Sequence, residues 1–181
     1  MKKLLSLLLS LLLVFSLSSC KNSNTNNVSN EDIIQPIPQL QIKVGEQTAN
    51  AIYGYYNYNA PIGDNHSQGG TQDYVNPLDL MQKPNIPIIT TNEKQAILNF
   101  VWEKLEKQSN PKFNTNPDKI SIVSWSDKEW GNTTATSEDV SLNDNTITLK
   151  PNGNIYEVKA EWTDKEKTSG TFIYHFCIIS E

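Results

Sequence analysis

Apolar and polar residues alternate with a period of two along the C-terminal part of the chain. Between residues 156 and 162 every second position is apolar or aromatic, and the positions between them are charged. Successive side chains of a β-strand point to opposite faces of a sheet, so this pattern predicts a half-buried strand. Residues 171–179 also alternate but carry apolar side chains on both faces. That pattern predicts a central strand.

Shorter segments upstream have the same period or are rich in aromatic and β-branched residues. We expect strands at residues 41–44, 51–58, 120–125, 140–142 and 146–149, the last two joined by a turn at 143–145. Residues 60–76 contain a proline and three glycines and are expected to form a loop. Short strands separated by turn signals are typical of a β-sandwich. We therefore predict a mainly β chain with a single antiparallel β-sandwich-like domain at residues 41–181.

One segment, residues 92–107, fits two structures. Its apolar residues recur at helical spacing over residues 97–105 and at every second position over residues 96–102. Its composition favours one short helix, whereas the β pattern on either side favours a strand at residues 95–103. We prefer the strand and keep the helix as the alternative.

The N-terminus has the pattern of a bacterial export signal. Two lysines follow Met1, and the Leu-rich run at residues 4–17 would span roughly 21 Å as a helix at about 1.5 Å per residue. A bilayer core is about 30 Å thick, so this run is expected to be a signal-peptide core and not a membrane anchor. We predict a cleaved signal at residues 1–19. A flexible tether is expected at residues 20–40, because its first part is almost wholly polar.

The sequence Leu17-Ser18-Ser19-Cys20 directly follows this run. It resembles the lipobox of bacterial lipoproteins, in which the cysteine thiol receives a diacylglycerol and becomes the first residue of the mature chain. The resemblance implies a lipid on Cys20, with the cell membrane as partner and the folded domain facing outside. Two acyl chains are enough for stable attachment. The alternative is an ordinary secretory signal with an incidental cysteine.

Further runs are PDKISI at 117–122, SWSD at 124–127, WGN at 130–132, the strand-like run at 155–162 and the run at 170–176, with NPLD at 76–79 as a further match. Over residues 50–181 these runs resemble a pattern in small Firmicutes lipoproteins of unknown role. The resemblance implies a compact C-terminal β domain and brings no activity with it. Residues 103–115 are extra to the pattern.

Composition limits the partners. The chain has 15 lysines, no arginine and 20 acidic residues. Removal of the two signal lysines would leave 13 lysines and a net charge of −7. Nucleic-acid binding needs clustered basic residues, so the charge disfavours nucleic acid and we expect no such partner. Zinc motifs and glycine-rich phosphate loops are missing from the sequence, and we expect no metal and no cofactor.

Few side chains suit catalysis. His175 and Cys177 would share one face of a strand. We expect a surface or strand-edge histidine and a buried thiol, with a thiol–histidine pair as the alternative. The loop from Asp64 faintly resembles a calcium loop, but its third position is His66 and its twelfth is Val75, which favours a solvated loop. We expect no catalytic residues and no enzyme.

Aromatic residues are the remaining candidates for ligand binding. Trp125 and Trp130 flank a polar loop, and Tyr55 and Tyr56 lie in an aromatic run. Rings stack on sugar faces while neighbouring amides and acids bind hydroxyl groups. These four residues are the candidate binding residues, and Trp130 is the one expected to have an exposed ring. The alternative places three tryptophans in the sandwich core: Trp102, Trp125 and Trp162.

Together these features predict a lipid-anchored protein on the outer side of the cell membrane, whose folded domain binds a glycan or a protein without catalysis. The alternative is a small envelope hydrolase or accessory enzyme. His175 and Cys177 distinguish the two, because an enzyme would place both in a solvent cleft within hydrogen-bond reach of a carboxylate.

Overall fold

The computed structural model describes residues 37–62, 66–102 and 116–180. These residues form strands and one short 3₁₀ turn, with the bounds β1 Gln39–Val44, β2 Gln47–Asn50, β3 Ile52–Ile62, β4 His66–Gln72, β5 Ile88–Thr91, β6 Gln95–Val101, β7 Lys119–Ser126, η1 Asp127–Glu129, β8 Glu138–Asp139, β9 Leu142–Asn143, β10 Thr146–Thr148, β11 Gly153–Trp162 and β12 Ser169–Ser180. The chain is therefore mainly β, as predicted.

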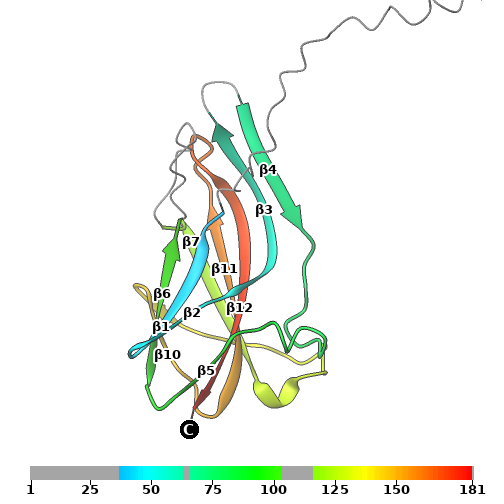
Figure 1. The fold of residues 1–181 in the computed structure, drawn as a ribbon, viewed down its shortest axis with the longest axis vertical. Coiled ribbons are helices and arrows are strands. Elements are labelled where there is room, and N and C mark those ends of the chain that lie inside the picture. The colour runs from blue at the N-terminus through cyan, green and yellow to red at the C-terminus, as the bar shows by residue number, and fades with distance from the viewer. Residues whose placement is uncertain (1–36, 63–65, 103–115, 181) are drawn as a thin grey trace, which may run out of the picture. The chain divides into compact units, whose positions relative to one another are not determined.

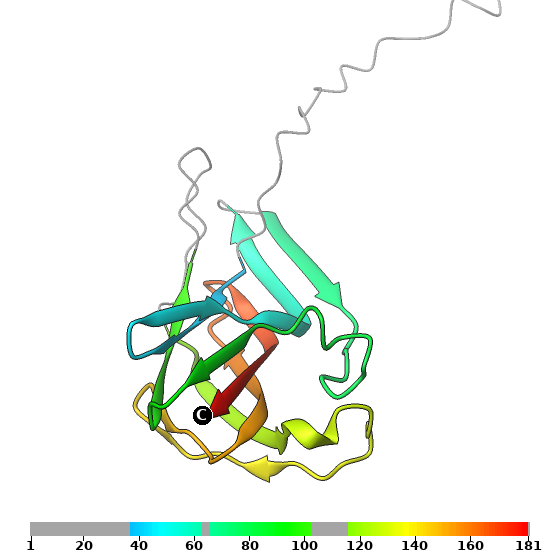
Figure 2. The same ribbon diagram turned by 60° about the horizontal axis from the view of Figure 1, so that its bottom comes forward.

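The strands form two sheets that pack together, which confirms the predicted β-sandwich-like domain (Figures 1 and 2). The smaller sheet has the order β2-β1-β6-β10-β9 and the larger sheet the order β4-β3-β12-β11-β7-β8. Neighbours in both orders are antiparallel, whereas β5 pairs in parallel with β12. β3 and β5 share one edge of β12, β3 along residues 169–175 and β5 along residues 177–180.

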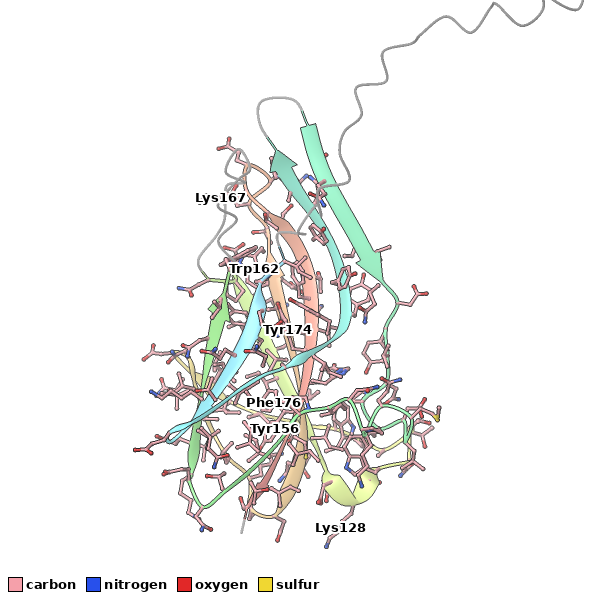
Figure 3. All side chains as sticks on the ribbon, in the orientation of Figure 1. Lys128, Tyr156, Trp162, Lys167, Tyr174 and Phe176 are labelled. Atoms are coloured by element: carbon pink, nitrogen blue, oxygen red, sulfur yellow. The ribbon has the colours of Figure 1, made fainter. Side chains whose placement is uncertain are left out.

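The strong alternation near the C-terminus produces two long neighbouring strands. β11 and β12 pair with each other, and β12 lies between β11 and β3, as predicted for a central strand. Their inward side chains are buried between the sheets and include Tyr156, Trp162, Tyr174 and Phe176 (Figure 3). The rings of Tyr156 and Phe176 stack with their centroids 5.1 Å apart. Burial of a side chain such as Phe176 contributes about 1.5–3 kcal/mol, so this strand pair supplies much of the core.

The ambiguous segment is a strand where the structure describes it. In β6, Ala96 and Leu98 are buried while Ile97 is exposed. β6 pairs with β1 on one edge and with β10 on the other. Helix propensity is a weak preference, and pairing on both edges overrides it. The helix alternative is therefore wrong for residues 95–101, and residues 103–115 lie outside the described part of the chain.

The predicted loop at residues 60–76 is wrong for residues 60–62 and 66–72. β3 continues to Ile62, and β4 follows from His66 to Gln72 as its hairpin partner. Gly69 and Gly70 indicated a loop, but a Cβ on either glycine would come within 2.8 Å of atoms of Tyr58. Here glycine allows two paired strands to approach closely and does not end a strand.

A second, smaller hydrophobic cluster lies on the outer face of the larger sheet. Ile155 and Cys177 are opposite each other in register and point away from the main core. Leu78 and Ile86 cover them from the segment after β4, and Ala135 packs from the segment before β8. Figure 2 shows these two segments, green and yellow-green, next to each other at one side of the domain. The outer face is therefore covered at one end.

The domain begins slightly before the predicted boundary at residue 41. β1 starts at Gln39, and the carbonyl of Pro38 accepts hydrogen bonds from Tyr53 at 3.2 Å and from buried Tyr174 at 2.6 Å. The predicted signal, Cys20 and the tether up to residue 36 lie outside the described residues. In the part of the chain that the structure describes, no helix is long and apolar enough to cross a membrane.

Candidate functional site

A pocket of about 460 Å³ lies where β7 ends. We call it the Trp125 pocket. It is formed by the end of β7, by η1, by the segment that leads to β8, by Lys150 after β10 and by Asn154 of β11. Its lining residues are Ser124, Trp125, Ser126, Glu129, Asn132, Thr134, Ala135, Thr136, Glu138, Lys150 and Asn154.

The chain reversal after β7 creates this pocket. Ser126 ends β7 and caps η1, because its Oγ accepts a hydrogen bond from the backbone N–H of Lys128 at 3.3 Å. The side chain of Asp127 packs over Gly153, where a Cβ would lie 2.3 Å from Oδ2. The chain then returns as β8, which pairs with residues 123–124 of β7. The returning segment therefore faces the strand that it left.

Hydrogen bonds fix the aromatic and amide groups of the pocket. The indole N–H of Trp125 donates to the carbonyl of Ala135 at 3.1 Å. The amide of Asn132 donates to Glu129 Oε2 at 2.8 Å, and the hydroxyl of Thr134 donates to Asn132 Oδ1 at 3.1 Å. One aromatic side chain thus lies beside hydroxyl, amide and carboxylate groups that are already oriented.

The charged groups of the pocket nearly cancel. Lys150 Nζ lies 2.6 Å from Glu138 Oε2. The hydrogen bond and the positive charge of Lys150 lower the pKa of the Glu138 carboxyl. The pair is exposed to solvent and contributes little to stability, but it neutralises both groups. Because Glu129 is the remaining charged residue, the pocket lining has a net charge of −1.

Ser124 is the most unusual residue of the pocket. Its side chain is 1% exposed, and its Oγ has no hydrogen-bond partner. A buried hydroxyl without a partner costs about 1–3 kcal/mol, so such a group needs an explanation. Ser124 lies between Ile122 and Ser126 on the inward side of β7, a position where the alternation of the strand calls for an apolar residue. That polar residue at an inward position is the sequence signal by which it could have been found.

The two tryptophans predicted as binding residues have different environments. Trp125 lines the pocket, whereas Trp130 does not. Trp130 is only partly exposed, packs against the second hydrophobic cluster, and has Lys83 Nζ 5.5 Å from its ring centroid. The expectation of a well-exposed ring at Trp130 is therefore wrong. In the core alternative, Trp162 is fully buried and Trp102 packs against the main core, but Trp125 packs against the outer cluster.

The two predicted tyrosines lie on opposite faces of β3. Tyr56 faces the main core, where its ring centroid lies 5.8 Å from that of Tyr53 and 6.5 Å from that of Phe172. Tyr55 points to the outer face and lines a separate hollow. Tyr56 is therefore a packing residue, and the four predicted residues do not form one site.

His175 is buried, which contradicts the expectation of a surface or strand-edge histidine. Its side chain is 1% exposed on the outer face of central strand β12. Nε2 lies 2.9 Å from Oε2 of Glu157, the residue directly opposite in β11. The hydroxyl of Tyr74 donates to the same carboxylate oxygen at 2.9 Å. Burial and the neighbouring Glu157 raise the pKa of Tyr74.

Cys177 is a buried thiol, as predicted. It is 1% exposed, and burial, together with the nearby charge of Asp127, raises the pKa of the thiol to about 12. A carboxylate does lie within hydrogen-bond reach of His175, but neither His175 nor Cys177 faces solvent. An enzyme would place both residues in a solvent cleft and a carboxylate within hydrogen-bond reach. The carboxylate is present, but both residues are buried.

The described residues contain no group of three or more His, Cys, Asp or Glu side chains that could hold a metal ion. The loop considered for calcium lies partly outside them, because residues 63–65 are not described. In comparisons with protein-family models, curated proteins and solved structures, the chain has no significant match. What the Trp125 pocket binds has to be inferred from its own chemistry.

Proposed function

We propose that this protein is a lipid-anchored module of the outer cell surface that binds a neutral sugar in the Trp125 pocket without catalysis. The anchor is the diacylglycerol on Cys20, supported by the lipobox-like sequence at residues 17–20. Two acyl chains hold a protein at a membrane without a spanning helix. The acidic net charge of the chain repels an anionic membrane surface and favours a domain that stands away from it.

The pocket chemistry favours a sugar. A pyranose ring has hydroxyl groups at its rim and an apolar face, so it needs an aromatic side chain beside paired donors and acceptors. Trp125 supplies the aromatic side chain, and Asn132, Thr134 and Glu129 supply the polar groups. The near-cancelled charge of Glu138 and Lys150 favours a neutral ligand over an ionic one.

One observation carries the proposal: the buried, unpartnered hydroxyl of Ser124 in the wall of the pocket. In the proposed complex the pocket opens over Ser124, and a sugar hydroxyl, which is both donor and acceptor, satisfies the buried Oγ. Residues that destabilise the free protein but contribute to ligand binding are typical of functional sites. A structural serine would be expected to have a partner within the protein.

The Ser124→Ala variant separates the two roles of this residue. Loss of an unpaired buried hydroxyl leaves the free energy of unfolding unchanged or raises it, whereas sugar binding weakens because a hydrogen bond is lost. We expect the full-length protein to bind a class of neutral oligosaccharides on a glycan array. Ser124→Ala should bind the same glycans about fivefold or more weakly, from a hydrogen bond worth about 1 kcal/mol.

A matched pair of threonines controls for indirect effects. Thr134 lines the pocket, and its exposed neighbour Thr133 does not. Thr134→Ala should weaken binding, and Thr133→Ala should leave it at the wild-type level. The proposal fails if no neutral glycan binds, or if binding is insensitive to both Ser124→Ala and Thr134→Ala.

Binding is preferred to hydrolysis because the catalytic candidates are inaccessible. His175 and Cys177 lie under the side chains of the outer cluster and of Tyr74. The raised pKa of Cys177 keeps the thiol protonated at neutral pH, and a thiol is a poor nucleophile compared with a thiolate. The Trp125 pocket has two carboxylates, but one of them, Glu138, already forms an ion pair with Lys150.

A further inference from the structure

The outer face of the larger sheet carries two neighbouring hollows beyond the covered end. Their volumes are about 460 and about 400 Å³, and both are lined by Tyr55 of β3 and Thr171 of β12. Tyr55 and Thr171 are therefore the junction of one continuous surface, which we call the Tyr55 trough. It is separate from the Trp125 pocket, because the two share no lining residue.

Tyr74 forms one end of the trough and is held in place although it is exposed. Its side chain is 48% exposed, yet its hydroxyl donates to Glu157, which also pairs with buried His175. The backbone N–H of Val75 donates to the carbonyl of Gly54 at 2.8 Å and fixes the chain beside β3. Partly buried Glu157, itself bonded to buried His175, thus orients a surface ring, which lowers the entropy lost when a ligand stacks on it.

The charge of the trough differs from that of the rest of the molecule. Its lining includes Lys159 and Lys165 and no acidic residue, in a chain with a net charge of −5. Lys159 Nζ pairs with Glu161, whereas Lys165 makes no ion pair with the described residues. The Trp125 pocket, by contrast, is lined by two glutamates and one lysine. The trough is complementary to an anion and the pocket is not.

We propose that the Tyr55 trough is a second binding site, which takes a segment of an acidic polysaccharide with carboxylate-bearing pyranose rings. Sugar rings stack on Tyr55 and Tyr74, and a carboxylate lies against the ammonium group of Lys165. Asn57, Asn59 and Thr171 offer hydrogen bonds to the hydroxyl groups. Stacking on aromatic rings explains why two tyrosines point outward here, and Lys165 selects the acidic sugar.

A galacturonic acid oligomer and its methyl ester are a matched pair of probes, because esterification removes the negative charge and keeps the ring. Binding to full-length protein is measured by titration calorimetry at low salt and at about 0.5 M salt, where charges separated by more than a few ångströms are screened. We expect the acid to bind and the ester to bind at least about tenfold more weakly. Added salt should weaken the binding of the acid.

Variants test the residues. Lys165→Gln and Tyr55→Ala should each weaken binding of the acid about fivefold or more, the loss typical of an important interface side chain (about 1 kcal/mol). Tyr55→Phe keeps the ring and should retain binding, which shows that Tyr55→Ala acts through stacking. Lys94→Gln, at an exposed lysine outside both sites, should bind as the wild type does.

Three results would each overturn the second site: equal binding of acid and ester, no effect of Lys165→Gln, or displacement of the acid by an equal concentration of inorganic polyphosphate. The last result would indicate a general anion surface. None of these measurements needs a ligand of the Trp125 pocket, so failure here leaves the proposed function untouched.

Discussion

The imidazole of His175 occupies the space that a side chain at residue 54 would need. A Cβ built on Gly54 would lie 2.0 Å from Cε1 of His175. The register between β3 and β12 shifts at this point, so Gly54 is an extra residue opposite a regular strand. The glycine therefore makes room both for a β-bulge and for the ring that bonds Glu157.

Gly54→Ala should destabilise the protein strongly. The new methyl group displaces the His175 ring and breaks its contact with Glu157, which leaves buried polar groups unpaired. We expect a loss of about 1–3 kcal/mol or more in the free energy of unfolding, measured by urea denaturation.

A double-mutant cycle controls this prediction. In a His175→Ala background the clash is gone, so Gly54→Ala should cost markedly less than in the wild type. Equal costs in both backgrounds would show that the strand bulge, and not the ring, excludes a side chain at this position.

The local pattern of apolar residues predicted three long strands. β7, β11 and β12 lie where the pattern placed them, and the turn at residues 143–145 is confirmed with Asp144 at φ 54°. β2 and β4 escaped prediction because they are edge strands with polar or glycine-rich sequences. Such strands are defined by the neighbour they pair with, and a local pattern contains no information about that neighbour.

The site residues were harder to predict because they depend on register. Glu157 and His175 occupy outward positions of two different strands, and only the pairing of β11 with β12 brings them opposite each other. Tyr74 reaches the same carboxylate from 83 residues away along the chain. A long-range contact of this kind leaves no local signal. Trp125 could be named as a candidate because aromatic residues beside polar loops are recognisable without register.

Asp118 should stabilise the protein at neutral pH and lose this effect in acid. Its carboxylate accepts hydrogen bonds from the backbone N–H and the hydroxyl of Thr163 at 2.6 and 2.8 Å. These bonds lower the pKa of Asp118 below its usual value of 3.8. A lowered pKa in the folded state means stabilisation that is present above the unfolded-state pKa and is lost as the pH falls through the folded-state pKa.

Urea denaturation of Asp118→Asn and wild type at several pH values tests this. The variant should be less stable at pH 7, and the difference should shrink as the pH falls below about 4. Asp73→Asn, at an exposed aspartate with no hydrogen bond to the described residues, is the control and should match the wild type throughout. A difference for Asp118→Asn that stays constant with pH would contradict the role of the ionised carboxylate.

Cys177 should react slowly with thiol reagents. Burial raises its pKa to about 12, so at pH 8 almost all of it is the unreactive thiol, and the reagent cannot reach the buried sulfur. A Cys20→Ser variant leaves Cys177 as the single thiol. We expect labelling by a disulfide reagent to be at least about a hundredfold slower in the folded protein than in urea, where burial is lost. Rapid labelling of the folded protein would contradict the burial.

Replacement of Cys20 tests the membrane anchor directly. The thiol of Cys20 is the only atom in the proposed mechanism that accepts the lipid, so Cys20→Ala removes the anchor and leaves the folded domain unchanged. Because the signal core is too short to span a bilayer, nothing else in the proposal retains the protein at the membrane. We expect wild type in the detergent-soluble membrane fraction and Cys20→Ala outside it, compared by immunoblot. Serine at position 20 should behave like alanine, since its hydroxyl does not take the thioether-linked lipid. If both variants remain in the membrane fraction, attachment does not depend on Cys20 and the signal core itself holds the chain.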